Sequence, residues 1–226
     1  MTETVTIPQD VPFSAAVKAI QARKGSRQSY AELERDRGWR TEVDDNLAAF
    51  LAAQTSMFLA TASADGQPYA QHRGGPPGFI RVLDKTTLGF ADFSGNQQFI
   101  TQGNLSENPR AMIFLIDYAY RQRIKIWGEA RIIEDDPALL RALMPAGYRA
   151  RPEQALLFRI AVWDINCKQH IPQKLDAADV KTALELRDAR IAELEAQLAA
   201  LKGSAASSAA RDAASARGTP SATSGE

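Results

Sequence analysis

The sequence predicts a mainly β domain of the α+β class, with an antiparallel sheet and peripheral helices. Three short runs of strand-forming residues follow one another within residues 57–93, namely MFLATA, QPYAQHR and TLGFADF, and FIRVL is a candidate continuation of the second run. Asp65-Gly66 lies between the first two runs, and glycine there supplies the positive φ that a tight hairpin requires. Residues 121–133 alternate aliphatic and polar side chains, which is the period of a half-buried strand.

Length and charge limit the classes of function. The 226 residues suffice for one domain with appendages, and 27 basic residues balance 27 acidic ones, so no overall field attracts nucleic acid or an anionic membrane. The single cysteine, Cys167, excludes an internal disulfide and fits a reducing compartment. The start, MTETVTIPQD, lacks the features of a secretory signal, and the longest apolar run, AMIFLI, is too short to span a bilayer. We expect a cytoplasmic protein without nucleic-acid or membrane partners.

Helices are expected before the sheet. Residues 1–44 are predicted to form an N-terminal extension with short helices at residues 14–23 and 30–37. Thr41 is a good N-cap for a further helix over residues 42–54. The spacing of its apolar residues predicts that this helix buries Val43, Leu47, Phe50 and Leu51.

A short helix and a strand are predicted after the first three strands. Ser94 or Asn96 can cap a helix over QQFITQGNL, with Phe99 and Ile100 facing inward. Residues 111–118, AMIFLIDY, form a continuous apolar run, as expected for a central strand buried on both faces.

The strand predicted over residues 121–133 carries a polar face that can be read in two ways. Its odd positions are Arg121, Arg123, Lys125, Trp127, Glu129 and Arg131. One interpretation is an ordinary solvated sheet face. The other is an anion-binding row, because cations on one face repel each other unless an anion compensates them.

The remainder of the domain is predicted to contain one helix and one strand. Asp136 followed by Pro137 is typical of a helix start, with aspartate as the N-cap and proline at the first position. Residues 155–165, ALLFRIAVWDI, form the last long strand.

The character of the chain changes after Pro172. Residues 173–202 are predicted to form a helix in which positions spaced by four and three form one seam: Val180, Leu184, Arg187, Ile191, Leu194, Leu198 and Leu201. Both a coiled coil and a single amphipathic helix packed on the main domain fit this pattern. Residues 203–226 are rich in Gly, Ser, Ala and Thr, and are predicted to be disordered because they have little to bury.

Three segments together carry a resemblance to a known family. MFLATASADGQPYAQHRGGPPGFIRV, FADFSGNQQFITQGNLSENPRAMIFLIDY and RQRIKIWGEARII occur in this order, and the chain resembles the pyridoxamine 5′-phosphate oxidase-like family of FMN-binding split barrels over residues 45–172. The resemblance implies a six-stranded antiparallel split β-barrel for this domain. It also implies FMN as the cofactor, bound at the interface of a homodimer.

The resemblance suggests which residues bind the cofactor. The positions that match are Gln71, Arg73, Asp92, Phe93, Ser94, Asn96, Gln97, Arg123, Lys125 and Trp127. Arg73 is the first candidate for the flavin phosphate, because a guanidinium group binds two oxygens at once. The family often has a lysine in the FADFSGNQQ segment that this chain lacks, which leaves the phosphate charge to Arg73 with Arg123 or Lys125.

The expected function is that of an FMN-dependent oxidoreductase acting on an unidentified small molecule, with a reduced nicotinamide as a candidate electron donor. The alternative is a non-catalytic flavin- or haem-binding protein used for storage, sensing or haem handling, and a deazaflavin could replace FMN. Pyridoxamine phosphate oxidase itself ends in a proline-terminated segment rich in tryptophan and arginine. The corresponding segment here is WDINCKQHIP, which has no arginine, so pyridoxal synthesis is not expected. Cys167 and His170 are too few for a zinc site, so no metal is expected. No catalytic residue is assigned, because in flavin enzymes the cofactor carries the redox step.

Overall fold

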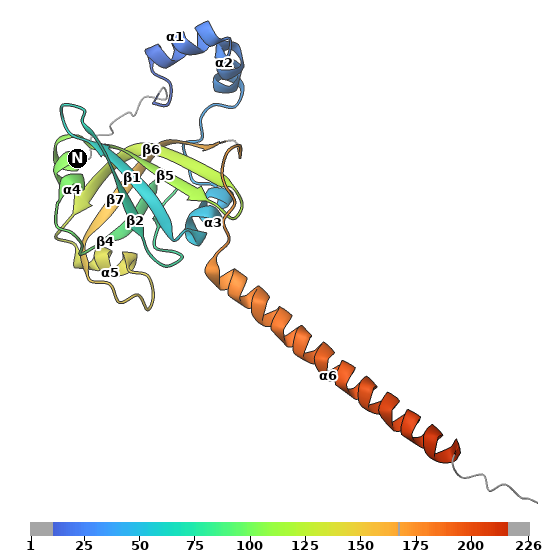
Figure 1. Ribbon diagram of the computed structural model, residues 1–226. Helices are drawn as coiled ribbons and strands as arrows, with labels where there is room; N and C mark the ends of the chain where they lie inside the picture. The colour runs from blue at the N-terminus through green and yellow to red at the C-terminus, as the bar shows by residue number, and fades with distance from the viewer. Residues whose placement is uncertain (1–10, 167, 217–226) are drawn as a thin grey trace, which may run out of the picture. The chain divides into compact units, whose positions relative to one another are not determined.

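The computed structural model describes residues 11–166 and 168–216, so Cys167 lies outside the described residues (Figure 1). The chain divides into two compact units between Gln173 and Lys174. Among the described residues, the first unit contains the sheet with five helices, and the second contains one long helix. Within the described residues, none of the helices combines the length and the apolar character that a membrane-spanning segment needs.

The first unit is built on one antiparallel sheet of seven strands in the order β2-β1-β5-β6-β7-β4-β3. The strands are β1 Ser56–Ala62, β2 Pro68–Gly74, β3 Arg81–Val82, β4 Thr87–Phe93, β5 Arg110–Asp117, β6 Gln122–Ile133 and β7 Pro152–Asn166. The two edge strands, β2 and β3, do not pair with each other, so the sheet stays open. This arrangement confirms the predicted fold class, an antiparallel α+β split barrel, with one strand more than expected.

The additional strand corrects one prediction. FIRVL does not continue the second strand: Arg81 and Val82 form β3, which pairs with Gly89 and Leu88 of β4. The cause is the intervening GGPPG segment, in which Gly78 has a φ of 81° and prolines cannot extend a ladder.

The first hairpin is confirmed. β1 pairs with β2 from Ser56 opposite Gly74 to Ala62 opposite Pro68, and Gly66 in the turn has a φ of 91°. The register places Tyr69, Gln71 and Arg73 on one face of β2, and His72 on the other.

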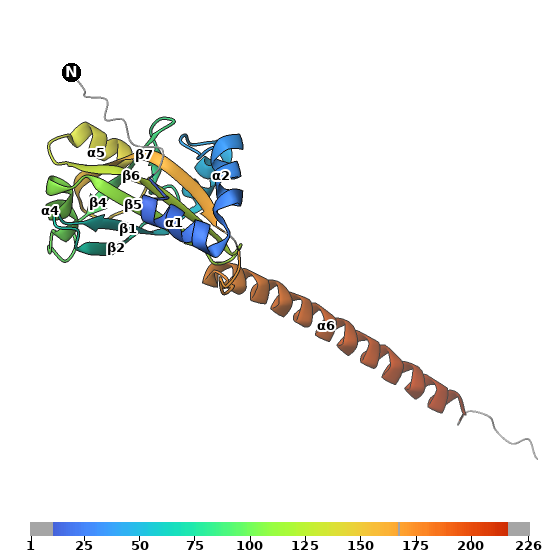
Figure 2. The same cartoon turned by 90° about the horizontal axis from the view of Figure 1, so that it is seen from above.

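The helices are α1 Ala15–Lys24, α2 Arg27–Asp36, α3 Asp45–Ala53, α4 Ile100–Glu107, α5 Pro137–Leu143 and α6 Ala177–Ala216. Asp136 caps α5 as predicted, accepting a hydrogen bond from the Leu139 amide at 2.8 Å. Figure 2 shows α4 beside β1 and β2, with which it is in contact.

Helix α3 begins later than predicted. Asp44, and not Thr41, is its N-cap, and the Asp44 carboxylate accepts a hydrogen bond from the Leu47 amide at 2.8 Å. The amide of Val43 instead donates to the carbonyl of Lys85 at 2.7 Å, so a tertiary contact keeps the preceding residues out of the helix. Leu47 and Leu51 are fully buried as predicted, while Val43 and Phe50 are partly buried against the core.

The core lies on the inner face of the sheet. On β6 the predicted alternation is confirmed, because Ile124, Ile126 and Ala130 are buried. Gly128 is required on this face, since a Cβ there would overlap the backbone oxygen of Arg159 at a β-bulge. Arg121 precedes the strand, in a turn with a φ of 53°.

The prediction that the central strand is buried on both faces is wrong for the single chain. On β5 only Ala111, Ile113 and Leu115 are buried, whereas the alternate residues Met112, Phe114 and Ile116 are half-buried. Successive side chains of a strand point to opposite faces, and none of the described residues of the first unit fully covers the outer face of β5.

The start of α4 also differs from the prediction. Neither Ser94 nor Asn96 caps the helix: its N-cap is Phe99, in the left-handed region with a φ of 54° and without a side-chain cap. Phe99 and Ile100 are 57% and 40% exposed, so they do not face inward as predicted.

Helix α6 is one continuous helix of 40 residues (Figure 1). It includes residues 203–216, for which disorder was predicted. Alanine has the highest helix propensity and dominates this stretch, AASSAARDAASA, so a helix already started can continue through it. The remainder of the predicted tail, residues 217–226, lies outside the described residues.

Candidate functional site

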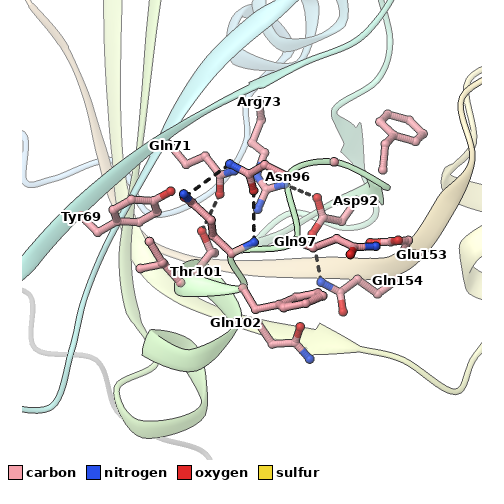
Figure 3. A pocket seen from close by; sticks show the side chains of 15 residues that line it. Tyr69, Gln71, Arg73, Asp92, Asn96, Gln97, Thr101, Gln102, Glu153 and Gln154 are labelled. Atoms are coloured by element: carbon pink, nitrogen blue, oxygen red, sulfur yellow. Dashed lines mark hydrogen bonds and ion pairs between the residues drawn. The ribbon is translucent and has the colours of Figure 1, made fainter.

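A pocket that is open to solvent lies where the sheet is open (Figure 3). β2 lines one side and β4 and β7 line the other, while the loop after β4 and the start of α4 cover it. The lining residues are Tyr69, Gln71, Arg73, Asp92, Phe93, Gly95, Asn96, Gln97, Gln98, Phe99, Ile100, Thr101, Gln102, Glu153 and Gln154. The side chains are mainly polar, and amides are the commonest group among them.

The centre of the pocket is an ion pair. Nη1 of Arg73 on β2 bonds to Oδ1 of Asp92 on β4, and Nε2 of Gln154 on β7 donates to the other carboxylate oxygen of Asp92 at 2.9 Å. The Arg73 and Asp92 side chains are only 16% and 10% exposed. Nε of Arg73 is buried and has no hydrogen-bond acceptor in the described part of the chain. The guanidinium group therefore retains donor capacity that the described residues do not use.

A second group of polar contacts fixes the side of the pocket formed by α4. Thr101 donates its hydroxyl hydrogen to Oε1 of Gln71 at 2.9 Å, and the Asn104 amide donates to the Thr61 hydroxyl at 3.0 Å. Thr101 and Asn104 are both buried. These contacts attach α4 to β1 and β2, so the loop between β4 and α4 is held at both ends.

That loop has an unusual backbone. Gln97 and Phe99 both have φ values in the left-handed region, 55° and 54°. Only a small minority of non-glycine residues adopt this conformation, and such residues concentrate at ligand-binding sites. The strain turns the chain sharply above the pocket and brings the amide side chains of residues 96–98 into its lining.

The structure brings together six of the ten predicted site residues. Gln71, Arg73, Asp92, Phe93, Asn96 and Gln97 line the pocket. Ser94 is adjacent in sequence but does not line it; its amide donates to the carbonyl of Arg151 at 2.9 Å. Whether these residues bind a cofactor stays a prediction.

The other three predicted residues lie on the opposite face of the sheet. Arg123, Lys125 and Trp127 alternate with the buried residues of β6 and are half-buried on the outer face. Nζ of Lys125 lies 5.0 Å from the centre of the Trp127 ring, a cation–π contact. Burial lowers the pKa of Lys125 and the Arg123 charge lowers it further, while the Asp164 carboxylate opposes both.

The outer face of the sheet is apolar around these residues. Phe58, Phe114 and Lys125 are neighbours across β1, β5 and β6, and Ala60, Met112 and Trp127 form the adjacent row. Phe58 is 40% exposed. His72 extends the first row on β2, where Ser56 Oγ and His72 Nε2 lie 2.8 Å apart, so His72 is outside the pocket.

Sequence reasoning missed several pocket residues. Gln154 is buried and bonded to Asp92, yet 62 residues separate them along the chain. One feature of the sequence could have indicated Gln154: it directly precedes the apolar run ALLF, and a strand that enters the core rarely carries an amide side chain there. Tyr69 could have been found from Gln71 and Arg73, because alternate strand residues share a face.

The comparison with protein-family models agrees with this fold. The family model described as pyridoxamine 5′-phosphate oxidase matches residues 43–167, more than half of the chain. The chain belongs to the pyridoxamine 5′-phosphate oxidase family. No significant match was found among curated proteins.

Several solved structures are similar to the chain at low sequence identity. HupZ from Group A Streptococcus is 18% identical, with 59% of this chain and 100% of that chain covered and a TM-score of 0.46. An FMN-binding protein from Syntrophomonas wolfei subsp. wolfei is 11% identical, with coverages of 68% and 98% and a TM-score of 0.41. An F420 reductase is 18% identical, with coverages of 56% and 100% and a TM-score of 0.39.

Proposed function

We propose that this member of the family is an FMN-dependent oxidoreductase that works as a homodimer, with the flavin bound in the pocket between β2 and β4. The observation that carries the proposal is the Arg73 guanidinium group, which is held by Asp92 and has a buried Nε without an acceptor. Buried donors are nearly always satisfied in folded proteins. We propose that an oxygen of a bound ligand bonds to this guanidinium group, whose Nε would have to become accessible when the ligand binds.

The lining of the pocket supports a flat, hydrogen-bonding ligand. Side-chain amides both donate and accept, and those of Gln71, Asn96, Gln97 and Gln98 face the same space. The polar edge of an isoalloxazine ring alternates carbonyl oxygens and ring nitrogens, so amides match it without a net charge. Phe93 and Phe99 add apolar surface for the ring faces.

The balance of charge supports a contribution from a second chain. Asp92 already neutralises Arg73, and Glu153 adds a negative charge at the exposed side of the pocket. A flavin phosphate carries a negative charge and needs cations beyond this pair. The cations of Arg123 and Lys125 lie on the outer face of the same chain, so a partner copy is the source we propose for them.

The exposed apolar side chains on the same outer face also support the proposal of a homodimer. Phe58, Met112 and Phe114 form a half-exposed apolar area that a second sheet would cover. In a symmetric dimer a contact between this area and the rim of the partner's pocket is made twice, so each subunit would bring its Arg123 and Lys125 to the flavin of the other.

The chemistry that we propose divides between cofactor and protein. Bound FMN would supply the hydride and electron transfer to or from a small-molecule substrate, with a reduced nicotinamide as the proposed donor. Arg73 and the amides would orient the cofactor, and the loop of residues 95–99 would exclude water. Among the described residues that line the pocket, Tyr69 is the only one of a type that usually binds haem iron, which supports flavin over haem in our proposal.

The test is the identity and reactivity of the bound cofactor. The full-length protein is purified, reconstituted with an excess of FMN or haem, and freed of unbound ligand, and the retained compound is identified by mass spectrometry after denaturation. We expect FMN to be retained and its visible absorption to bleach when a reduced nicotinamide is added without oxygen. Retention of haem but not FMN would overturn the proposal. Retained FMN that no reduced nicotinamide or deazaflavin bleaches would overturn its enzymatic part.

A further inference from the structure

The second unit carries an apolar seam that a single helix cannot bury. On α6 the seam consists of Val180, Leu184, Arg187, Ile191, Leu194, Leu198 and Leu201. Its apolar members are 39–67% exposed. We propose that α6 pairs in parallel and in register with α6 of a second copy of this chain, as a two-stranded coiled coil over residues 180–201. This proposal is independent of flavin binding.

The spacing assigns each residue a position in the heptad. Because the steps alternate between four and three, Leu184, Ile191 and Leu198 occupy a positions, and Val180, Arg187, Leu194 and Leu201 occupy d positions. A seam with a period of 3.5 residues stays in one line only when two helices wind around each other. A helix packed on a globular domain instead presents a wider apolar face with the helical period of 3.6.

The flanking charges favour the parallel orientation. In a parallel pair, Arg190 at a g position faces Glu195 at the e position of the other copy, and symmetry makes this contact twice. In the antiparallel pair that overlaps this seam most fully, Arg190 would face Arg190, and Asp188 would face Asp188. Arg190 already contacts Glu193 of its own helix at 2.6 Å, so the two carboxylates would share one guanidinium group.

The polar residue within the seam is also consistent with this pair. Arg187 at a d position would face its own counterpart, a repulsion that costs stability. Asp188 follows it at the e position, where the carboxylate of each copy lies next to the arginine of the other. A single buried polar layer fixes register, since any shift would place Arg187 against aliphatic residues.

Cysteine cross-linking of the full-length protein tests both pairing and orientation. In a Cys167→Ser background, Leu201→Cys should form a covalent dimer under mild oxidation, because equivalent d positions of a parallel pair are close enough for a disulfide. The matched control is Ala196→Cys, at an f position on the outside of the helix, which should remain monomeric on a denaturing gel. In the antiparallel pair the two copies of residue 201 would be roughly 35 Å apart, at 1.5 Å of rise per residue.

Two further measurements give the outcomes that would overturn the proposal. A mixture of Val180→Cys and Leu198→Cys proteins would cross-link preferentially only in the antiparallel pair. Absence of a covalent dimer with Leu201→Cys, or equal yields with Leu201→Cys and Ala196→Cys, would mean that the helices do not pair. Adding Arg190→Glu to Leu201→Cys should lower the yield severalfold, and adding Glu195→Arg as well should restore it. A yield that does not respond to these charges would contradict the parallel register.

Discussion

Arg73 on β2 and Asp92 on β4 form an ion pair across the opening of the split barrel (Figure 3). No backbone ladder joins these two sides of the sheet, so side chains make the connection there. Gln154 supports Asp92 from β7, and the three side chains form one polar network at the base of the pocket. The pair therefore both links the edges of the fold and sets the direction of the guanidinium group.

The first prediction concerns Arg73. Its replacement by alanine should weaken FMN binding by about 1.5–3 kcal/mol, the usual contribution of a charge-assisted hydrogen bond. Arg73→Lys should recover only part of this loss, since the planar fork is absent. Flavin fluorescence titration measures both. Arg141→Ala, which removes an exposed arginine on α5, is the control and should bind FMN as the original chain does. Equal affinities for Arg73→Ala and Arg141→Ala would show that the flavin does not contact this guanidinium group.

The second prediction separates stability from affinity at Asp92. Asp92→Asn removes the partner charge of a nearly buried arginine, so the flavin-free protein should lose about 1–3 kcal/mol of unfolding free energy in urea. The freed charge of Arg73 should then attract the flavin phosphate more strongly, and FMN should bind severalfold tighter. Weaker binding by Asp92→Asn would mean that Asp92 mainly positions Arg73.

The elements that depend on local sequence could be predicted closely. TLGFADF forms β4 over the predicted residues, and the alternation of β6 places Ile124 and Ile126 in the core. Both predictions rest on the alternation of side chains between two faces, which every strand imposes on its own residues. The start of α3 could not be predicted in this way, because the hydrogen bond from Val43 to Lys85 depends on a segment some forty residues later.

The pocket residues show the same difference between what the sequence predicts and what only the folded chain brings together. Arg73 and Asp92 could be predicted from the resemblance to the family. Gln154 could not, because only the pairing of β4 with β7 brings it to Asp92. Arg123, Lys125 and Trp127 lie on the far face of β6, so their predicted role requires a second chain. The left-handed backbone at Gln97 and Phe99 has no signal in the sequence, since neither residue is glycine or asparagine.

The third prediction compares two candidate caps of α3. Asp44→Ala should destabilise the protein by about 1 kcal/mol, because the Leu47 amide loses its acceptor. Thr41→Ala should change the stability little, since Thr41 precedes the cap. Urea unfolding of the two variants decides between them. The reverse order of stabilities would favour a helix that begins at residue 42.

The fourth prediction concerns pH and Lys125. Burial lowers the pKa of Lys125 below the ordinary 10.5, so the unfolded chain holds this proton to higher pH than the folded protein does. Between the lowered pKa and 10.5 the unfolded state binds more protons, and stability contributed by this group must rise with pH.

Lys125→Met tests this linkage. The variant should be the more stable protein at neutral pH, where burying the charged lysine is unfavourable, and its advantage should shrink as the pH approaches 10.5. Urea unfolding in steps of pH, without flavin, measures the difference between the two proteins. A difference that is constant with pH would show that Lys125 is not desolvated.

The most direct test of the flavin-bound homodimer is native mass spectrometry of the full-length protein reconstituted with FMN. The pocket and the basic row lie on opposite faces of one chain, so the site that we propose would take residues from both copies. We predict a dimer carrying two FMN molecules, and loss of both FMN molecules whenever the dimer dissociates on dilution. A monomer that retains one FMN would contradict the account.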